Sequence, residues 1–398
     1  MTTEALSALA GDVTRATPRP DKVAAPGGSV GEAPWRIWLI LGDKAGDNAQ
    51  VRIVADALGW PYALKQLAFR APYVIGKPRF RSSLHHVDQA RSDPLEPPWP
   101  DLVLTVGRRP SMAALWVKEQ AQGRARLVVI GRPKRWLDRF DLVIAPPQLQ
   151  LPRRPNVVPL ALPLMRVDEA AVAAAAEAWR ARCADLPRPL TALLVGGPTK
   201  PYRFDAAVAA RLLDETSSVV RRDGGSLYVT TSRRTPPAVV QALEAGLPEA
   251  ARLYRWDGGG DNPYHALLGL ADRFIVTGDS ISMMVEVARL AKPLAIFALP
   301  EARHAPRLRS ALGRGLTKLE EGPAHAVVEP LAEVLYRLRI AKYARDLSEI
   351  HRRLYASALA VPLGAPFRPP PSGVPDDLAQ AAERVRTLME RPLDWKEA

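Results

Sequence analysis

Short apolar runs that alternate with longer amphipathic stretches constrain the fold of this chain more than any other feature. Runs of aliphatic and β-branched residues occur at 35–41, 101–106, 126–130 and 141–144, and again at 191–195, 225–232, 251–256, 274–276 and 294–299. Apolar residues at helical spacing follow several of these runs. Strands that alternate with helices are typical of a parallel sheet with helices on both faces. The pattern therefore predicts an α/β protein built from two Rossmann-like halves that face each other across a cleft.

Composition and proline placement predict where the parts of the chain begin and end. Residues 1–34 are rich in Ala, Pro, Gly and Thr and lack the apolar core of a secretory signal, so we expect a disordered tail. After the last strong strand, Leu347, Ile350 and Leu354 continue a helical spacing that begins at Tyr343. This stripe either completes the core of the second half or crosses back to the first. The predicted parts are a first domain at 35–165, a connector at 166–186, a second domain at 187–340 and a helical tail at 341–398.

Charge is distributed unevenly between the two halves. The formal net charge is +13; residues 35–165 carry 20 Lys and Arg against 10 Asp and Glu, whereas residues 187–340 carry 20 against 16. A basic first half suits phosphorylated small molecules, anionic lipid surfaces or nucleic acid. The basic residues lack the regular aromatic interleaving of a nucleic-acid-binding module, so we expect no nucleic-acid partner.

One basic segment stands out within the first half. Lys65, Arg70, Lys77, Arg79 and Arg81 lie there among apolar residues. We predict that this segment meets an anionic membrane surface or a lipidic partner; a solvated loop is the alternative.

The cysteine count and the hydropathy indicate the cellular compartment of the protein. The single cysteine, Cys183, excludes a disulfide within the chain and a cysteine zinc site, which fits a reducing compartment. No stretch is apolar for long enough to span a bilayer. We therefore expect a cytoplasmic protein, associated peripherally with the inner face of the cytoplasmic membrane.

The stretch from Arg273 to Glu286 carries the strongest functional signal. A buried strand at 274–276 is followed by a polar turn from Thr277 through Asp279 to Ser280, and then by a helix. This order places backbone N–H groups at a helix N-terminus, where an anion can bind. Ser282 and Glu286 are four residues apart and share one face of the helix. A helix cap made by Asp279 or Ser280 alone is the structural alternative.

Other glycine-rich and polar turns exclude some enzyme classes. The pair Gly196-Gly197 follows the strand at 191–195, and Gly258-Gly259-Gly260 follows the run at 251–256. Neither matches a dinucleotide fingerprint or a P-loop lysine motif, which disfavours hydride transfer and NTP hydrolysis.

A set of motifs between about Trp35 and Ile340 resembles a known family. They are Gly42-Asp-Lys-Ala-Gly-Asp-Asn-Ala-Gln50, Pro100-Asp-Leu-Val-Leu-Thr-Val-Gly-Arg108, Ile130-Gly-Arg-Pro133, Phe140-Asp-Leu-Val-Ile144, Pro155-Asn-Val157, Val195-Gly-Gly-Pro-Thr-Lys200 and Val276-Thr-Gly-Asp-Ser-Ile-Ser-Met-Met-Val-Glu286. Together they resemble the bacterial branch of the mitochondrial-fission "elongated mitochondria" family. One departure is that Pro147-Gln-Leu-Gln150 stands where members carry a His-Asp pair, which puts an acid/base role there in doubt.

The resemblance implies a GT-B glycosyltransferase architecture, in which the C-terminal domain binds a nucleotide sugar. It implies that Ser280, Ser282 and the turn at Thr277–Asp279 hold the diphosphate and that Glu286 holds the ribose. It also favours a tail that crosses back to the first domain and continues as a helix from Asp376 to Met389. The plant members are adaptors for a dynamin-related protein at mitochondria, so a protein partner is an open possibility for this chain.

On this basis the chain is predicted to be a glycosyltransferase that uses a nucleotide diphosphate sugar and a membrane lipid or envelope glycan acceptor. A non-catalytic scaffold that binds a protein or a membrane is the alternative. Asp43 or Asp47 would be the catalytic base. No metal or other cofactor is expected beyond the donor substrate. The predicted nucleotide-sugar residues are Gly196, Gly197, Thr231, Ser232, Arg233, Asn262, Tyr264, Thr277, Asp279, Ser280, Ser282, Met283 and Glu286; of these, Thr231, Ser232 and Arg233 would stabilise the leaving phosphate, and Asn262 and Tyr264 would line the base pocket.

Overall fold

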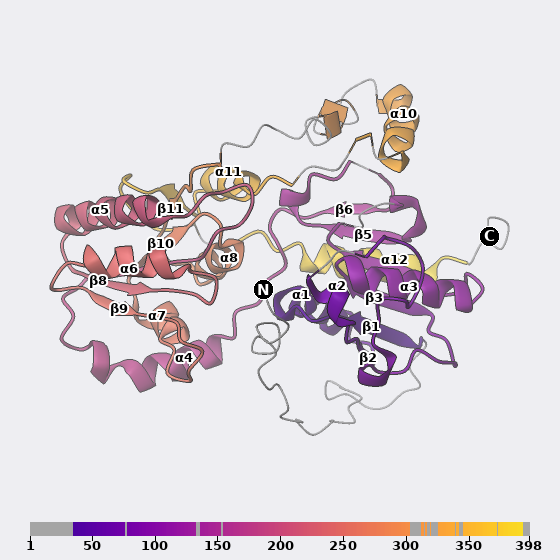
Figure 1. Ribbon diagram of the computed structural model, residues 1–398, viewed down its shortest axis with the longest axis horizontal. Helices are drawn as coiled ribbons and strands as arrows, with labels where there is room; N and C mark the ends of the chain where they lie inside the picture. The colour runs from indigo at the N-terminus through magenta and orange to yellow at the C-terminus, as the bar shows by residue number, and fades with distance from the viewer. Residues whose placement is uncertain are drawn as a thin grey trace, which may run out of the picture.

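The computed structural model describes residues 35–392 except 76–77, 133–135, 153, 303–311, 314, 317–318, 320–324, 339, 342–344 and 372. The predicted tail at 1–34 lies outside these residues, as do Lys77 and Tyr343. Two parallel six-stranded sheets, each accompanied by helices, form the two halves of the molecule (Figure 1). The predicted α/β fold with two Rossmann-like halves is therefore confirmed.

The first half contains β1 (Ile37–Leu41), α1 (Ala45–Leu58), β2 (Ala63–Gln66), α2 (Ala71–Ile75), β3 (Leu102–Val106), α3 (Arg108–Gln120), β4 (Arg126–Ile130), β5 (Leu142–Ala145), the 3₁₀ turn η3 (Pro147–Leu149) and β6 (Val157–Pro159). The second half contains α4 (Glu169–Trp179), β7 (Leu190–Leu194), α5 (Ala206–Asp223), β8 (Ser226–Thr230), α6 (Pro237–Ala245), β9 (Arg252–Tyr254), α7 (Tyr264–Leu270), β10 (Arg273–Thr277), α8 (Ile281–Arg289) and β11 (Leu294–Phe297). The last elements are α10 (His325–Arg337), α11 (Ser348–Ala356), β12 (Val361–Pro362) and α12 (Leu378–Glu390).

The order of strands fixes where a ligand can enter each sheet. The first sheet runs β2-β1-β3-β4-β5-β6 and the second β12-β11-β10-β7-β8-β9. The chain reverses its direction of travel across the sheet between β1 and β3, and again between β7 and β10. In open α/β sheets, ligands bind outside the carboxyl ends of the strands at such switch points. The two candidate positions are therefore the loops after β1 and β3 and the loops after β7 and β10.

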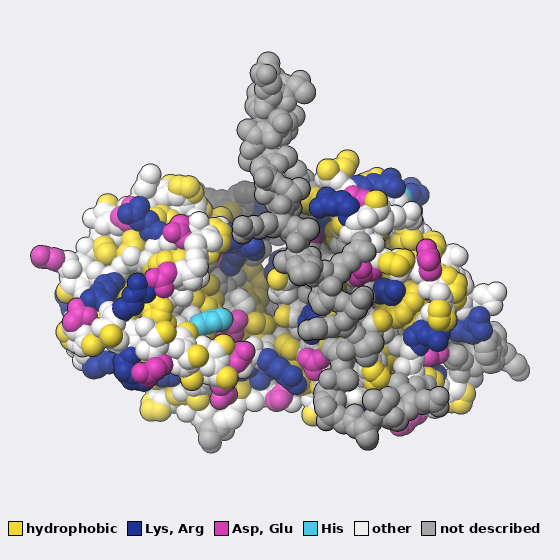
Figure 2. Space-filling view, turned by 90° about the horizontal axis from the view of Figure 1, so that it is seen from below, with side chains coloured by type: hydrophobic (Ala, Val, Ile, Leu, Met, Phe, Trp, Pro, Cys, Tyr) yellow, Lys and Arg dark blue, Asp and Glu magenta, His cyan; other side chains and the backbone are white. Residues whose placement is uncertain are grey.

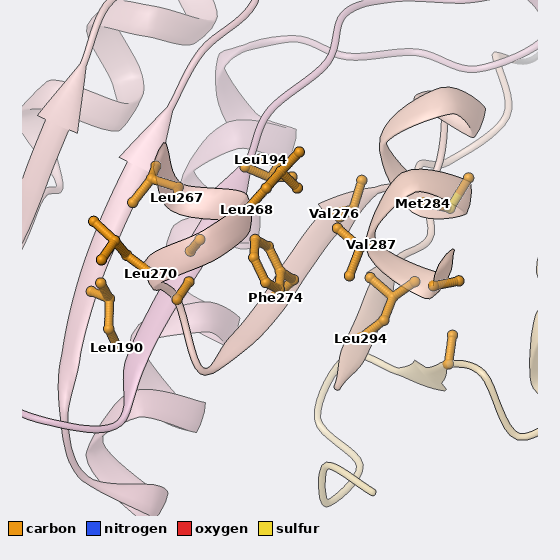
Figure 3. Packing of buried hydrophobic residues seen from close by; sticks show 14 of the residues in the cluster. Leu190, Leu194, Leu267, Leu268, Leu270, Phe274, Val276, Met284, Val287 and Leu294 are labelled. Atoms are coloured by element: carbon orange, nitrogen blue, oxygen red, sulfur yellow. The ribbon is translucent and has the colours of Figure 1, made fainter. Parts of the chain in front are cut away.

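The central strands are anchored by apolar side chains on both faces. All five residues of β10 are buried, as are those of β7. Phe274 and Val276 of β10 belong to one core cluster with Leu194 of β7 and with Met284 and Val287 of α8 (Figure 3). Because β10 and α8 share this core, the turn between them has fixed supports on both sides.

The predicted connector at 166–186 is part of the second domain rather than a free link. Val172 and Ala176 of α4 are buried in the same core cluster as Ala266 and Leu270 of α7. A Cβ atom on Gly269 would lie 2.7 Å from the Cβ of Ala176, so the two helix backbones approach closely. Small side chains on both helices permit that approach, which explains why an Ala-rich stretch packs instead of linking.

The predicted second domain, 187–340, also needs a correction at its end. Leu316, Ala332 and Tyr336 are buried in a core cluster of the first domain, together with residues such as Phe80 and Val143. Arg154 of the first domain forms an ion pair with Glu329 of α10 at 3.6 Å. Leu316, α10 and Ala341 therefore lie on the first domain, as the position of α10 in Figure 1 also shows.

The rest of the predicted tail contributes helices to the cores of both domains. Ile350 and Leu354 of α11 are fully buried in a core cluster of the second domain, which is the first of the two alternatives for that stripe. Val385 and Met389 of α12 are buried with α1 in a core cluster of the first domain. Arg126 at the start of β4 donates a hydrogen bond to the carbonyl of Leu388. α11 also contacts the first domain, because Arg353 donates hydrogen bonds to the carbonyls of Leu160 and Ala161. The chain then returns to the core of the first domain through α12.

None of the described helices is both long and apolar enough to cross a bilayer.

Replacing Met389 with Ala tests whether α12 belongs to the core of the first domain. The thioether is 2% exposed, and removal of a buried Met side chain costs about 2–5 kcal/mol of unfolding free energy. We expect a lower urea midpoint for Met389→Ala than for the wild type. The neighbouring Glu390→Ala is the control, because Glu390 is exposed. Equal midpoints for the two variants would mean that α12 only rests on the surface.

Candidate functional site

The turn between β10 and α8 is built around a carboxylate that has no exposed surface. The side chain of Asp279 is 0% exposed. Its Oδ2 accepts a hydrogen bond from the backbone N–H of Gly197 at 2.9 Å, and its Oδ1 accepts one from the hydroxyl of Thr277 at 2.8 Å. The Thr277 hydroxyl oxygen accepts in turn from the N–H of Gly196 at 2.9 Å. Thr277 and Asp279 therefore tie the end of β10 to the end of β7, and their side chains support the turn instead of lining its surface.

A cation from the neighbouring strand end completes this arrangement. Arg234, which follows β8, lies 2.9 Å from Asp279 Oδ2 through Nη2, and the same nitrogen donates to the Ser280 hydroxyl at 3.0 Å. Its Nη1 donates to the Thr199 hydroxyl at 2.7 Å. The side chain is 43% exposed, so one face of the guanidinium reaches solvent beside the turn. The sequence analysis named Arg233 instead. Both arginines are exposed, and only the contacts with Asp279, Ser280 and Thr199 distinguish Arg234.

The two glycines after β7 are required by close approach. A Cβ on Gly196 would lie 2.1 Å from the Ser280 hydroxyl oxygen, and a Cβ on Gly197 would lie 2.1 Å from the carbonyl oxygen of Arg234. Real Cβ atoms do not come this near to backbone oxygens. Gly196 and Gly197 therefore let three strand ends meet, and the N–H groups of both face inward to Thr277 and Asp279.

The first turn of α8 presents its backbone N–H groups at this point. Ser280 is the N-cap residue, and its side chain makes no capping hydrogen bond. The first N–H groups of a helix lack partners within the helix and attract anions. The first turn contains no acidic residue, and it includes Ser282, which is exposed, and Met283, which is partly exposed.

Glu286 lies one helical turn beyond Ser282 and is held by a tyrosine. The hydroxyl of Tyr264 at the start of α7 donates to Glu286 Oε2 at 2.5 Å. Burial raises the pKa of Glu286, against the opposing effect of the Tyr264 hydrogen bond. Burial and the adjacent carboxylate also raise the pKa of Tyr264 well above its usual range. The pair fixes the orientation of Glu286 and leaves Oε1 without a hydrogen bond among those the structure describes.

The other predicted residues of the second domain hold loops in place. Thr231 accepts a hydrogen bond from the N–H of Trp256 at 2.8 Å, which joins the ends of β8 and β9. The N–H of Ser232 donates to the hydroxyl of Thr235 at 2.9 Å. Asn262 accepts from the N–H of Tyr264 at 3.0 Å and so starts α7. These contacts place Thr231, Ser232 and Asn262 at the carboxyl edge of the sheet. Their roles in ligand binding stay predictions.

The segment before and within α11 brings the carboxyl edges of the two sheets together. His351 Nε2 donates to the carbonyl of Gly278 at 2.7 Å, in the turn after β10. A few residues earlier, the N–H of Asp346 donates to the carbonyl of Gln148 at 2.8 Å, in η3 after β5. Burial lowers the pKa of His351, so its ring is neutral near pH 7. The loops that follow the strands of both sheets therefore meet around residues 346–351, and Figure 2 shows a hollow between the two halves.

The two predicted catalytic bases lie in the first domain, and each forms an ion pair with a basic side chain. Both oxygens of Asp43 accept hydrogen bonds from Arg109 Nη2 at 2.8 Å. Asp47 is 3.9 Å from the ammonium group of Lys44. Asp43 therefore lies in an ion pair with Arg109, while the side chain of Asp47 is 40% exposed. The catalytic role of both residues stays a prediction.

A family model described as mitochondrial fission ELM1 matches residues 45–386. The chain belongs to this family. Over 280 residues it is 29% identical to the mitochondrial fission protein ELM1 of Arabidopsis thaliana, a match that covers 63% of this chain and 65% of the plant protein, slightly less than two thirds of its length. It is 24% identical over 302 residues to the uncharacterized protein RP120 of Rickettsia prowazekii (strain Madrid E), which covers 66% of this chain and 83% of that one.

This ELM1-family chain is also similar to solved structures at low identity. The UDP-GlcNAc 2-epimerase from Methanocaldococcus jannaschii aligns with a TM-score of 0.44 and 10% identity, covering 89% of this chain and 99% of that one. The ADP-heptose lps heptosyltransferase II of E. coli aligns with a TM-score of 0.37 and 12% identity, covering 67% of this chain and 87% of that one.

Gly197→Ala tests the close approach of the strand ends. The added methyl group would meet the Arg234 carbonyl, and such overpacking costs about 1–3 kcal/mol. We expect a lower melting temperature. Gly46→Ala is the matched control, because nothing lies within 4 Å of a Cβ at that helical position, and a Gly-to-Ala change there stabilises by about 0.4–1 kcal/mol. Similar melting temperatures for the two variants would refute the tight packing of the turn.

Proposed function

We propose that this protein is a glycosyltransferase that moves a sugar from a nucleotide diphosphate sugar to a lipid-linked or envelope glycan acceptor. The observation that carries the proposal is the first turn of α8. It lies at the switch point between β7 and β10, it has no side-chain cap, and Arg234 lies beside it with a half-exposed guanidinium. Free N–H groups and a cation that converge on one point form a site for a diphosphate.

The pair of Tyr264 and Glu286 supports a nucleotide rather than a simple anion. A carboxylate one turn along the helix from the diphosphate can accept hydrogen bonds from a ribose diol. Tyr264 holds Glu286 through Oε2 at 2.5 Å. A side chain that is oriented in advance loses less entropy when it binds, which favours affinity.

The proposal predicts that nucleoside diphosphates stabilise the protein and that Glu286→Gln weakens their binding. Loss of one charged hydrogen bond corresponds to about 1.5–3 kcal/mol, or roughly ten- to hundredfold in Kd. Calorimetric titration with UDP, GDP, ADP and CDP would identify the base and measure the change. Glu249→Gln is the control, because Glu249 is an exposed glutamate in the loop between α6 and β9. The donor site would be wrong if none of these nucleotides bound to the wild type.

Nucleotide-sugar binding without transfer is the second candidate function, and the state of Asp43 favours it. A carboxylate that accepts two hydrogen bonds from Arg109 at 2.8 Å is poorly placed to take a proton from an acceptor hydroxyl. The two candidates differ in one measurement. Release of nucleoside diphosphate from a bound sugar nucleotide in the presence of lipid acceptors supports transfer, and binding without release supports a scaffold.

A lipid-linked acceptor would need a surface that meets the membrane, and α10 offers one. Val327, Leu331, Val334 and Leu338 form one stripe and are 80%, 58%, 51% and 64% exposed. The opposite face of α10 packs on the first domain through residues that include Ala332 and Tyr336.

The sequence around this stripe is suited to an anionic bilayer. Arg337, Arg339, Lys342 and Arg345 fall within or just after the stripe, and no acidic residue occurs from 334 to 345. Basic residues next to apolar ones favour an anionic lipid surface. By contrast, Phe69 and Phe80 of the basic segment at 65–81 are 7% and 3% exposed, so they are not available to a bilayer.

Sedimentation with vesicles of phosphatidylglycerol and phosphatidylcholine tests this surface. We expect Val334→Ser to weaken binding to the mixed vesicles about tenfold, since burial of one aliphatic side chain is worth about 1.5 kcal/mol, and binding to fall as salt rises. Val74→Ser is the matched control, because Val74 and Val334 are both 51% exposed. If Val74→Ser were the damaging change, the segment at 65–81 would be the membrane surface instead.

A further inference from the structure

One buried side chain of α11 contacts the turn between β10 and α8. His351 is 6% exposed, and its Nε2 donates a hydrogen bond to the carbonyl of Gly278 at 2.7 Å. Gly278 directly precedes Asp279 and the N-cap residue Ser280. His351 and Gly278 are 73 residues apart in the sequence. A side chain from the C-terminal part of the chain therefore reaches the turn on which the proposed diphosphate site depends.

Glycine at position 278 permits this contact. A Cβ there would lie 2.6 Å from Cε1 and 2.9 Å from Nε2 of His351, so a side chain would displace the imidazole ring. The N–H of Gly278 donates to the carbonyl of Phe297, at the end of β11, at 2.9 Å. Both backbone polar groups of Gly278 are thus engaged, the N–H by the neighbouring strand and the carbonyl by α11.

The ring of His351 is oriented before any ligand arrives. It stacks with Tyr202 of the loop after β7, with the ring centroids 6.4 Å apart and the planes 11° from parallel. Ile350 and Leu354, on either side of His351 in α11, are fully buried in a core cluster of the second domain. Because the helix and the ring both have packed neighbours, the position of the Nε2 donor is fixed.

The hydrogen bond from His351 determines which way the peptide between Gly278 and Asp279 faces. In a trans peptide the carbonyl and the N–H point in opposite directions, so the N–H of Asp279 points away from His351. This N–H donates no hydrogen bond within the part of the chain that the structure describes. If the peptide reversed, a carbonyl oxygen would take the place of this N–H, and its partial negative charge would repel an anion.

We propose that His351 is a positioning residue for the diphosphate site. By holding the carbonyl of Gly278, it keeps the N–H of Asp279 available to an anion together with the N–H groups of the first turn of α8. Donors that are aligned in advance bind without rearrangement. The identity of the anion rests on the proposed function, whereas the fixed orientation of the peptide does not. His351 acts through Gly278 and contacts no ligand itself.

Two variants separate the hydrogen bond from the packing of the ring. His351→Gln keeps an N–H donor on a flexible side chain, whereas His351→Met fills a similar space without a donor. Calorimetry with the full chain measures the Kd of UDP and of inorganic pyrophosphate. We expect His351→Met to raise both Kd values by the same factor, roughly two- to tenfold for one net hydrogen bond, and His351→Gln to bring them back towards the wild type. Glu286→Gln should weaken UDP binding alone, because pyrophosphate has no ribose.

Hydrogen exchange of the amides from 278 to 284, measured without nucleotide, tests the turn independently of any ligand. Exchange should be faster in His351→Met than in the wild type, because the turn opens more often. Ile350→Val is the control for a loss of stability, since Ile350 is fully buried in α11 and its side chain has no hydrogen-bonding group. This control should lower the melting temperature and leave both Kd values unchanged.

The proposal is overturned if His351→Met binds both probes as the wild type does, or if His351→Gln or Ile350→Val weakens them as much as His351→Met. If neither probe binds to the wild type, the donor site fails. Faster exchange in His351→Met would then still support the role of His351 in fixing the turn, and unchanged exchange would refute that role as well.

Discussion

The carboxyl edge of the second sheet depends on the buried carboxylate of Asp279. A charge with no exposed surface is costly unless it is fully paired and hydrogen-bonded. Here the partners come from three places in the chain, the N–H of Gly197, the hydroxyl of Thr277 and the guanidinium of Arg234. These three partners are far apart in the sequence, and the folded sheet brings them together. The carboxylate therefore assembles the ends of β7, β8 and β10 into one rigid rim.

At this rim, some polar groups support the backbone and others are placed where a ligand could bind. The side chains of Thr277 and Asp279 face inward and fix the backbone. The first turn of α8 has no side-chain cap, and the side chain of Arg234 is 43% exposed. Such preorganisation is what an anion site requires, since donors that are already aligned need no rearrangement when the ligand arrives. From sequence, inward and outward polar side chains in one turn look the same, so both were predicted as ligands.

The apolar runs predicted the inner strands and one of the four edge strands, β9. Every strand that an apolar run indicated is present in the structure. The structure adds three strands that the sequence analysis did not predict, β2, β6 and β12. All three are edge strands, and β2 has no buried residue, so none shows a continuous apolar run. The same limit applies to the candidate site. The sequence of strand, turn and helix was enough to place Glu286 and the glycines at the rim. The role of Arg234 rather than Arg233, and the pairing of Asp43 with Arg109, depend on contacts between distant segments.

The course of the chain between the domains has a mechanical consequence. The chain passes from the first domain to the second by Val167, is back in the core of the first at Leu316, lies in the second again at Leu347, and returns a last time after Val374. The halves are therefore joined covalently at four points along the sequence. A single proteolytic cut in any one link would leave the halves tethered by the other three. The first domain expressed alone as residues 35–165 would lack α10 and α12, which the C-terminal part of the chain contributes to its core.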